Sequence, residues 1–295
     1  MKYLVIDSIA RSGTTLLSSL IRSQKRCVTF DGNFIEPWNI YGEPNIPLNN
    51  GYRSLEHENN SNQNYQSYVK DIMKTFSAPF AGERIMMGKT FSEWKKILNI
   101  EFTNYDLLYD NIAKEFNSDL IGFRWNQNLF YAPRWLSRSK QHYWVVVVRN
   151  PLDRTVSNLK THNWTFNDCV KLSQELDRKF WILKERYPNR LLLIYYEDLV
   201  SDTKNEMQSF FSKINFQIDQ INTENLIGAN NQPYRNQGWR VKKEKQDHRK
   251  GSKFVTFYNS SINQYEAHLS VNQITELKSK LSGLKLFKRY FNGEQ

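Results

Sequence analysis

A fully apolar stretch near the middle of the chain limits the possible folds more than any other feature. Residues 143–148 read YWVVVV, and such a β-branched run is typical of a strand buried on both faces of a parallel sheet. The run ends at Arg149, and Asn150 followed by Pro151 is a strong helix start. The sequence therefore predicts a strand that leads directly into a helix over residues 152–160.

The N-terminus shows the same strand-to-helix pattern. Its apolar run stops at Ser12-Gly13-Thr14-Thr15, and helical spacing resumes at once. In such a turn glycine lets the backbone approach a ligand, and the first N–H groups of the helix point at an anion. We interpret the turn as a phosphate-binding loop in which Arg11 supplies the cation and the threonine hydroxyls bind phosphate oxygens. A capped helix that simply follows a strand gives the same local pattern.

The loop differs from the nucleotide-triphosphatase motif GxxxxGK[ST]. Ser8 stands where that motif has its first glycine, and Thr14 stands where it has its lysine. The sequence therefore favours an anion that arginine and hydroxyl groups bind without magnesium.

A third junction follows further along the chain. Residues 191–199 read LLLIYYEDL, which predicts a buried strand running into Tyr196-Glu197-Asp198. Ser201 is the expected cap of the next helix. That helix should bury one stripe of apolar residues at helical spacing, namely Met207, Phe210, Phe211 and Ile214.

Strands and helices alternate through most of the chain. Helical periodicity is seen over residues 65–76, 105–116, 166–187 and 272–281, strand character over 119–125, and residues 24–66 are polar and turn-rich. This order predicts an α/β fold in three layers, α/β/α, with a central parallel sheet and ligands at its carboxyl edge. With 295 residues, the chain is expected to form a single domain over residues 1–295.

Together, the three junctions resemble the sulfotransferases that use 3′-phosphoadenosine 5′-phosphosulfate (PAPS). ARSGTTLL resembles the 5′-phosphosulfate loop of that family, in the arginine form of tyrosylprotein sulfotransferases and many bacterial relatives. VVVVRNPLDRTVS resembles the 3′-phosphate element, and YYEDL resembles the strand end that follows it. The resemblance implies the P-loop-like sulfotransferase fold and PAPS as the cofactor, with no metal ion.

The resemblance also implies which residues bind the cofactor. Arg11, the SGTT turn and Tyr196 belong to this set, and Arg149 and Ser157 stand at the family's spacing for the 3′-phosphate. Arg149 can form a bidentate pair with a phosphate, and Ser157 can add a hydroxyl hydrogen bond.

The net charge of +11 is concentrated in residues 235–253, which hold eight Lys or Arg against Glu244 and Asp247. Such a stretch is either a solvated or nucleic-acid-binding segment, or it folds over an anionic cofactor. Arg249-Lys250-Gly251 resembles the RKG segment that caps the 3′-phosphate in cytosolic sulfotransferases, although the family's second glycine is missing.

The catalytic base is not fixed by the sequence. Cytosolic relatives have a histidine in a KTH segment, but the matching stretch here is GFRW. Relatives that act on carbohydrates and tyrosine use a glutamate after the first helix, and this chain offers Glu36, which we favour, and Asp31. Lys89, in MGKTF, resembles a lysine that lies beside the transferring sulfonate in relatives.

A carboxylate base and an arginine loop favour a sugar hydroxyl as the acceptor, ahead of a small phenol and a peptide tyrosine. Two rival functions are a P-loop kinase and a nucleic-acid-binding protein that uses residues 235–253. No secretory signal or membrane-spanning run is apparent, which implies a soluble, cytoplasmic protein or a chain from which an anchor was removed. Cys27 and Cys169 are too few for a disulfide framework or a zinc site, so we expect buried thiols.

Overall fold

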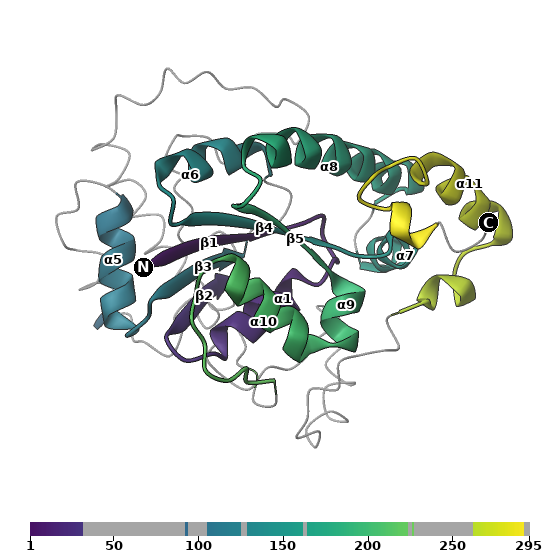
Figure 1. The fold of residues 1–295 in the computed structure, drawn as a ribbon. Helices are drawn as coiled ribbons and strands as arrows, with labels where there is room; N and C mark the ends of the chain where they lie inside the picture. Colours follow the sequence, from purple (N-terminus) through teal and green to yellow (C-terminus); the bar gives the residue numbers. More distant parts are fainter. Residues whose placement is uncertain are drawn as a thin grey trace.

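The strands form one parallel sheet with helices on both faces (Figure 1). This computed structural model describes residues 1–31, 92–93, 105–124, 129–161, 164–223, 226 and 262–291. Five strands are hydrogen-bonded in the order β2 (Cys27–Asp31), β3 (Leu120–Arg124), β1 (Lys2–Asp7), β4 (His142–Val148) and β5 (Leu191–Tyr195). Every strand pair is parallel. The predicted α/β class and parallel sheet are therefore confirmed.

The helices form a layer on each side of the sheet (Figure 1). One layer contains α1 (Thr14–Arg22), α9 (Tyr196–Ser201) and α10 (Thr203–Lys213). The other contains α5 (Tyr105–Glu115), α6 (Ala132–Arg138) and α8 (Phe166–Arg186). At the carboxyl end of the sheet lie α7 (Pro151–Thr161), α11 (Val271–Leu281) and the short 3-10 helices η7 (Gln264–Ala267) and η8 (Lys288–Tyr290), while η3 (Leu129–Tyr131) precedes α6.

The strand order has a topological switch point at the carboxyl edge, between β1 and β4. After β1 the chain crosses to β2 on one side of the sheet, whereas after β4 it crosses to β5 on the other side. In parallel sheets such a switch point is where ligands typically bind. The β1–α1 and β4–α7 loops both start at this point.

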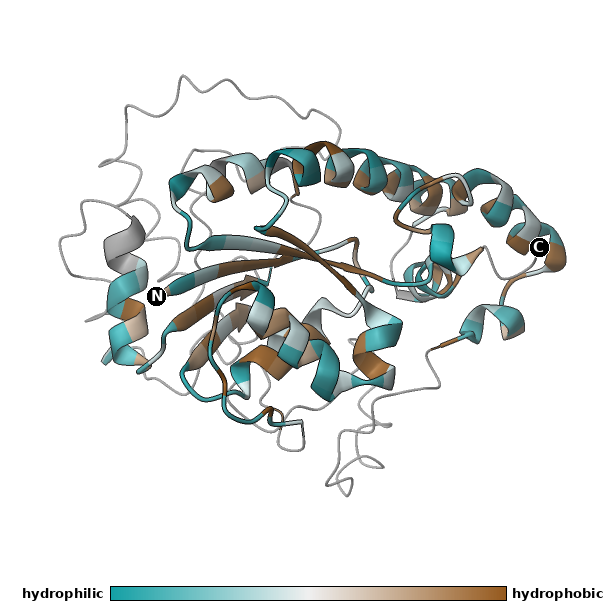
Figure 2. Ribbon diagram, viewed as in Figure 1, coloured by the Kyte–Doolittle hydropathy of each residue, from teal (hydrophilic) through white to brown (hydrophobic). Residues whose placement is uncertain are grey.

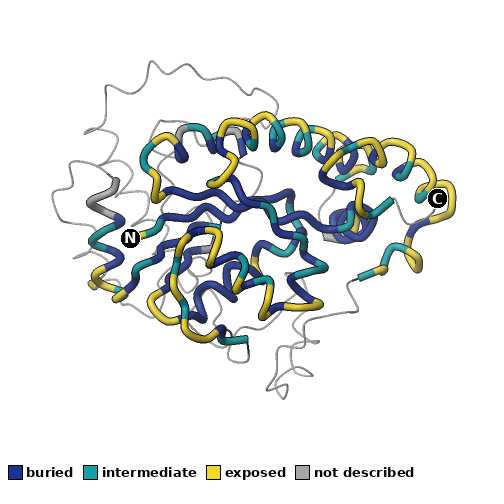
Figure 3. Tube along the Cα trace, in the orientation of Figure 1, coloured by how far each residue is buried: buried dark blue, intermediate teal, exposed yellow. Residues whose placement is uncertain are grey.

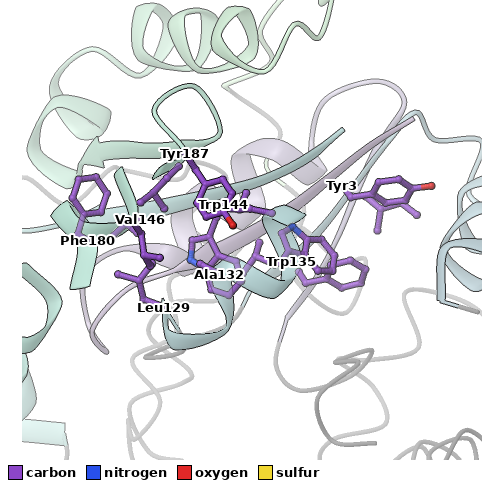
Figure 4. Packing of buried hydrophobic residues seen from close by; sticks show 14 of the residues in the cluster. Tyr3, Leu129, Ala132, Trp135, Trp144, Val146, Phe180 and Tyr187 are labelled. Atoms are coloured by element: carbon purple, nitrogen blue, oxygen red, sulfur yellow. The ribbon is translucent and has the colours of Figure 1, made fainter. Parts of the chain in front are cut away.

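The central strand β4 is buried on both faces, as the apolar run predicts. Trp144, Val146 and Val148 pack with α5, α6 and α8, and the residues between them pack with α1, α9 and α10. Figure 4 shows Trp144 and Val146 among side chains from η3, α6 and α8. The apolar strands lie in the middle of the molecule and the exposed, polar helix faces lie outside (Figures 2 and 3).

One strand was missed by the sequence prediction. Residues 24–66 were expected to be a polar loop, but Cys27–Asp31 forms the edge strand β2. Val28 and Phe30 face one core, whereas Thr29 is fully buried on the other side. The Thr29 hydroxyl donates to the carbonyl oxygen of Ser18 over 2.8 Å. Because the polar residue Thr29 occupies a core position, where its hydroxyl is hydrogen-bonded, the sequence of this strand looks polar.

The third junction also differs from its prediction. The strand β5 ends at Tyr195, and α9 begins directly at Tyr196. Ser201 is the last residue of α9, where its hydroxyl donates to the carbonyl oxygen of Asp198, so it does not cap α10. Asp202 caps that helix instead by accepting from the Asn205 N–H. The predicted apolar stripe of α10 is confirmed, since all its members are buried: Met207, Phe210, Phe211 and Ile214.

The other helix and strand predictions that fall on described residues are confirmed. The structure has the expected helices α5, α7, α8 and α11 and the strand β3 within a few residues of the predicted bounds. Cys27 and Cys169 are buried free thiols, as expected. The helix predicted over residues 65–76 lies outside the described residues. None of the helices described here combines the length and apolarity that crossing a bilayer requires.

His142, at the start of β4, is a buried histidine in an aromatic cluster. Its ring stacks on Tyr3 with centroids 4.7 Å apart and meets the edge of Trp135 at 4.8 Å. Burial, assisted by the charges of Arg138 and Arg190, lowers the pKa of His142 from 6.5 to about 3. The folded protein therefore keeps a neutral imidazole where the unfolded chain binds a proton.

We expect this histidine to make the protein acid-sensitive. Because the folded-state pKa is depressed, stability is fully present above pH 6.5 and is lost as pH falls toward 3, by at most about 1.4 kcal/mol per pH unit. His142→Phe keeps a ring in the cluster and should flatten this slope. Urea unfolding of the wild-type and His142→Phe proteins between pH 7 and 4.5 measures how the free energy of unfolding depends on pH. The same pH dependence in both proteins would contradict the role of His142.

Candidate active site

The loop between β1 and α1 has the backbone of an anion-binding turn. Arg11 has a φ of 72° and Gly13 has a φ of 96°, so both are left-handed. Ser12, which lies between them, does not have a positive φ. Gly13 is the N-cap residue of α1, and glycine has no side chain with which to cap that helix end. Alternating handedness turns successive N–H groups toward one concavity, and the helix dipole adds positive potential there. This geometry supports the interpretation as a phosphate-binding loop.

Tyr196 closes one side of this loop. A Cβ atom on Gly13 would lie 2.2 Å from Cδ2 of Tyr196, so only glycine fits beneath the ring. The guanidinium carbon of Arg149 lies 5.0 Å from the centre of the same ring. Tyr196 therefore packs between the first loop and the arginine of the second junction.

The β4–α7 junction is joined directly to the first loop. Arg149 donates from Nη1 to the carbonyl oxygen of Arg11 over 3.1 Å, and Asn158 donates from Nδ2 to the carbonyl oxygen of Ala10 over 3.2 Å. Asn150 caps α7 as predicted, because its Oδ1 accepts from the Leu152 N–H over 2.9 Å. The loops that follow the two strands are therefore hydrogen-bonded to each other.

The side chains of Arg11 and Ser157 are in contact. Arg11 donates from Nε to Oγ of Ser157 over 3.0 Å, although 146 positions separate them. The sequence assigned these residues to opposite ends of the ligand, and the structure makes them neighbours. In this bond the Ser157 hydroxyl is the acceptor, so it draws the Arg11 guanidinium toward α7.

The loop has a buried hydroxyl that a bound anion would satisfy. Ser12 is 1% exposed, and its Oγ has no hydrogen-bond partner among the described residues. A buried polar atom left without a partner typically costs about 1–3 kcal/mol. An anion bound in this turn offers the missing oxygen, and Arg11 and Arg149 offer the countercharge. The residues present therefore fit a phosphate group.

Arg124 is a candidate residue that the sequence reasoning missed. It ends β3, and its Nη1 donates to Oγ1 of Thr15, in the first turn of α1, over 3.0 Å. Thr15 is exposed, whereas Thr14 is buried. The signal that could have identified it is an arginine at the end of a buried strand, in the GFRW segment.

Glu197 was also missed as a site residue. One of its carboxylate oxygens accepts from the Asn150 N–H over 2.8 Å, and the other accepts from the Tyr290 hydroxyl over 2.5 Å. Burial raises the pKa of Glu197 against the opposing effect of these hydrogen bonds. The contact with Tyr290 spans 93 positions of the chain, and no local pattern indicates it.

Several predicted residues cannot be placed. Glu36 and Lys89 lie outside the described residues, and so do Arg249, Lys250 and Gly251. Asp31 ends β2 in register with Arg124, so its backbone reaches the carboxyl edge of the sheet, but its side chain is not described. Among the described residues, no group of three His, Cys, Asp or Glu side chains is arranged to hold a metal ion.

The sheet order and the loop define an α/β protein with a loop suited to binding an anion at its topological switch point. Residues 4–220 match the profile of the sulfotransferase family, so the chain belongs to that family. No curated protein gives a significant match.

Two solved structures share the fold. The sulfotransferase domain of the Synechococcus PCC 7002 olefin synthase is 15% identical, with 94% of this chain and 93% of that chain covered and a TM-score of 0.50. The sulfotransferase domain from the curacin biosynthetic pathway is 15% identical, with 95% and 96% covered and a TM-score of 0.51. At this identity, the likeness concerns the fold alone.

Proposed function

We propose that this sulfotransferase moves a sulfonate from PAPS to a hydroxyl acceptor. The contact between Arg11 and Ser157 carries the proposal, because it joins the anion-binding loop to the helix that follows Arg149. A donor with phosphates at both its 5′ and 3′ positions needs two such neighbouring anion sites. We also propose that residues 1–295 form a single sulfotransferase domain.

The proposed donor site uses both strand-end loops. Its 5′ end would be held by the residues of the β1–α1 loop, Arg11, Ser12, Gly13, Thr14 and Thr15. Its 3′-phosphate would be held by Arg149 and Ser157, with Tyr196 beside them. The buried position of Arg149, which is 6% exposed, supports this role because a charge pair is strengthened away from water. We assign Arg249, Lys250 and Gly251 to the same phosphate.

The chain supplies electrostatic stabilisation and a base. When bound, the donor supplies a sulfonate whose transfer leaves negative charge on the 5′-phosphate. Arg11 stays protonated, so it stabilises that charge and does not donate a proton. We assign the acceptor's proton to Glu36, with Asp31 as the alternative base, and place Lys89 beside the sulfonate.

We favour a carbohydrate acceptor. A phenol and a peptide tyrosine follow, and an aliphatic alcohol is a further class of hydroxyl to test. The experiment is transfer of labelled sulfonate from PAPS to an oligosaccharide, a phenol, a tyrosine peptide and an aliphatic alcohol. Each reaction is run with EDTA and with magnesium.

The proposal expects labelled product from at least one acceptor, at the same rate with EDTA and with magnesium. Phosphate transfer from ATP that requires magnesium would instead favour the rival kinase function. Salt-sensitive binding of random oligonucleotides, without sulfonate transfer, would favour the nucleic-acid-binding function.

A further inference from the structure

The first residues of α9 contact both the candidate site and the C-terminal segment. Tyr196 packs on Gly13 and lies under the Arg149 guanidinium. The next residue, Glu197, binds the backbone that follows Arg149 and also the C-terminal Tyr290. The start of α9 therefore links the candidate site to the C-terminal segment.

Glu197 holds the Arg149–Asn150 peptide through its N–H group. The Asn150 N–H donates to one carboxylate oxygen over 2.8 Å, while the side chain of Asn150 caps α7. Arg149 is therefore held from two sides, by the Tyr196 ring at its guanidinium and by Glu197 at the peptide that follows it. A shift of this carboxylate would move the backbone that carries the guanidinium.

Tyr290 fixes the orientation of that carboxylate. Its hydroxyl donates to the second oxygen of Glu197 over 2.5 Å, so both oxygens of the half-buried carboxylate accept a hydrogen bond. The C-terminal segment also binds the neighbouring residue of α9, because Arg289 donates to both carboxylate oxygens of Asp198 over 2.6 Å each. The guanidinium carbon of Arg289 lies 4.2 Å from the centre of the Tyr195 ring.

We propose that Glu197 and Tyr290 are positioning residues for Arg149 and so set the preference for a 3′-phosphorylated nucleotide. Tyr290 lies beyond residues 4–220, the part of the chain that matches the family profile. The inference rests on the proposed function, in which Arg149 binds the 3′-phosphate. Neither residue touches the ligand in this account, because the bonds of Glu197 are directed at Asn150 and Tyr290.

Tyr290→Phe tests the proposal, with Tyr3→Phe as the matched control. Both changes delete a hydroxyl that donates to a carboxylate over 2.5 Å, but Tyr3 bonds to Asp110 near the amino edge of the sheet. Calorimetry would measure the affinities for adenosine 3′,5′-bisphosphate and for AMP. We expect Tyr290→Phe to lower the preference for the bisphosphate about tenfold, the usual worth of one hydrogen bond to a charged group, and Tyr3→Phe to leave it unchanged.

Two Glu197 variants separate positioning from general stability. Glu197→Gln keeps an oxygen that can accept from the Asn150 N–H and should retain most of the preference, whereas Glu197→Ala should lose it. Thermal unfolding of all four variants checks that each one is folded. An unchanged preference in Tyr290→Phe, with stability lowered as in Tyr3→Phe, would overturn the positioning role and leave the proposed function intact. Wild-type protein that binds the two nucleotides equally would overturn both.

Discussion

Gly13→Ala is expected to lower the affinity for adenosine 3′,5′-bisphosphate about 100-fold or more. The backbone φ of 96° at this position costs an L-residue about 1–2 kcal/mol. The new Cβ would also lie 2.2 Å from Cδ2 and 2.9 Å from Cε2 of Tyr196. Displacing that ring removes its contact with Arg149, so one methyl group disturbs both proposed phosphate sites.

Gly283→Ala is the matched control for this change. A Cβ atom at Gly283 meets nothing within 4 Å, and the backbone there is not left-handed. Calorimetry with the bisphosphate and urea unfolding would be measured on both variants. We expect Gly283→Ala to bind the bisphosphate as the wild-type protein does. If Gly13→Ala also bound it with wild-type affinity, the loop would not hold the nucleotide.

Arg149→Ala is expected to remove most of the preference for the bisphosphate over AMP, a loss on the order of 2 kcal/mol or about 30-fold. Arg149 is buried at the end of β4 and donates to the carbonyl oxygen of Arg11, so its side chain is already ordered before a ligand binds. Arg149→Lys should recover only part of the preference, because an ammonium cannot form the bidentate pair.

Arg190→Ala controls for the loss of a guanidinium that donates to the backbone. Arg190 also donates to backbone carbonyl oxygens, those of Leu136 and Ser139, but it lies where β5 begins, at the opposite edge of the sheet. Its removal should lower stability without changing the ratio of the two affinities. If Arg149→Ala kept the wild-type ratio, the 3′-phosphate would have to bind elsewhere.

The local parts of the fold could be predicted because their chemistry is local. The run over residues 143–148 has to be buried on both faces, and Asn150-Pro151 starts a helix in almost any context. Likewise, Gly13 stands in the sequence where the structure has a left-handed turn. Each of these signals lies within a few residues of the feature it predicts.

The assembly of the site could not be predicted in the same way. The carboxyl ends of parallel strands were expected to meet, but the sequence does not give the order that places β3 between β2 and β1. The contacts of Arg11 with Ser157 and of Glu197 with Tyr290 depend on that order and on where the C-terminal segment docks. The strand β2 was missed because its polar residue Thr29 lies in the core, where its hydroxyl donates a hydrogen bond to Ser18.

Binding of two nucleotides to the wild-type protein tests the central claim most directly. Titration calorimetry would compare adenosine 3′,5′-bisphosphate with ATP, each with EDTA and with magnesium. If the joined loops form a site for 5′- and 3′-phosphates, the bisphosphate will bind far more tightly than ATP, and magnesium will not change its affinity. Tighter binding of ATP that depends on magnesium would contradict the account.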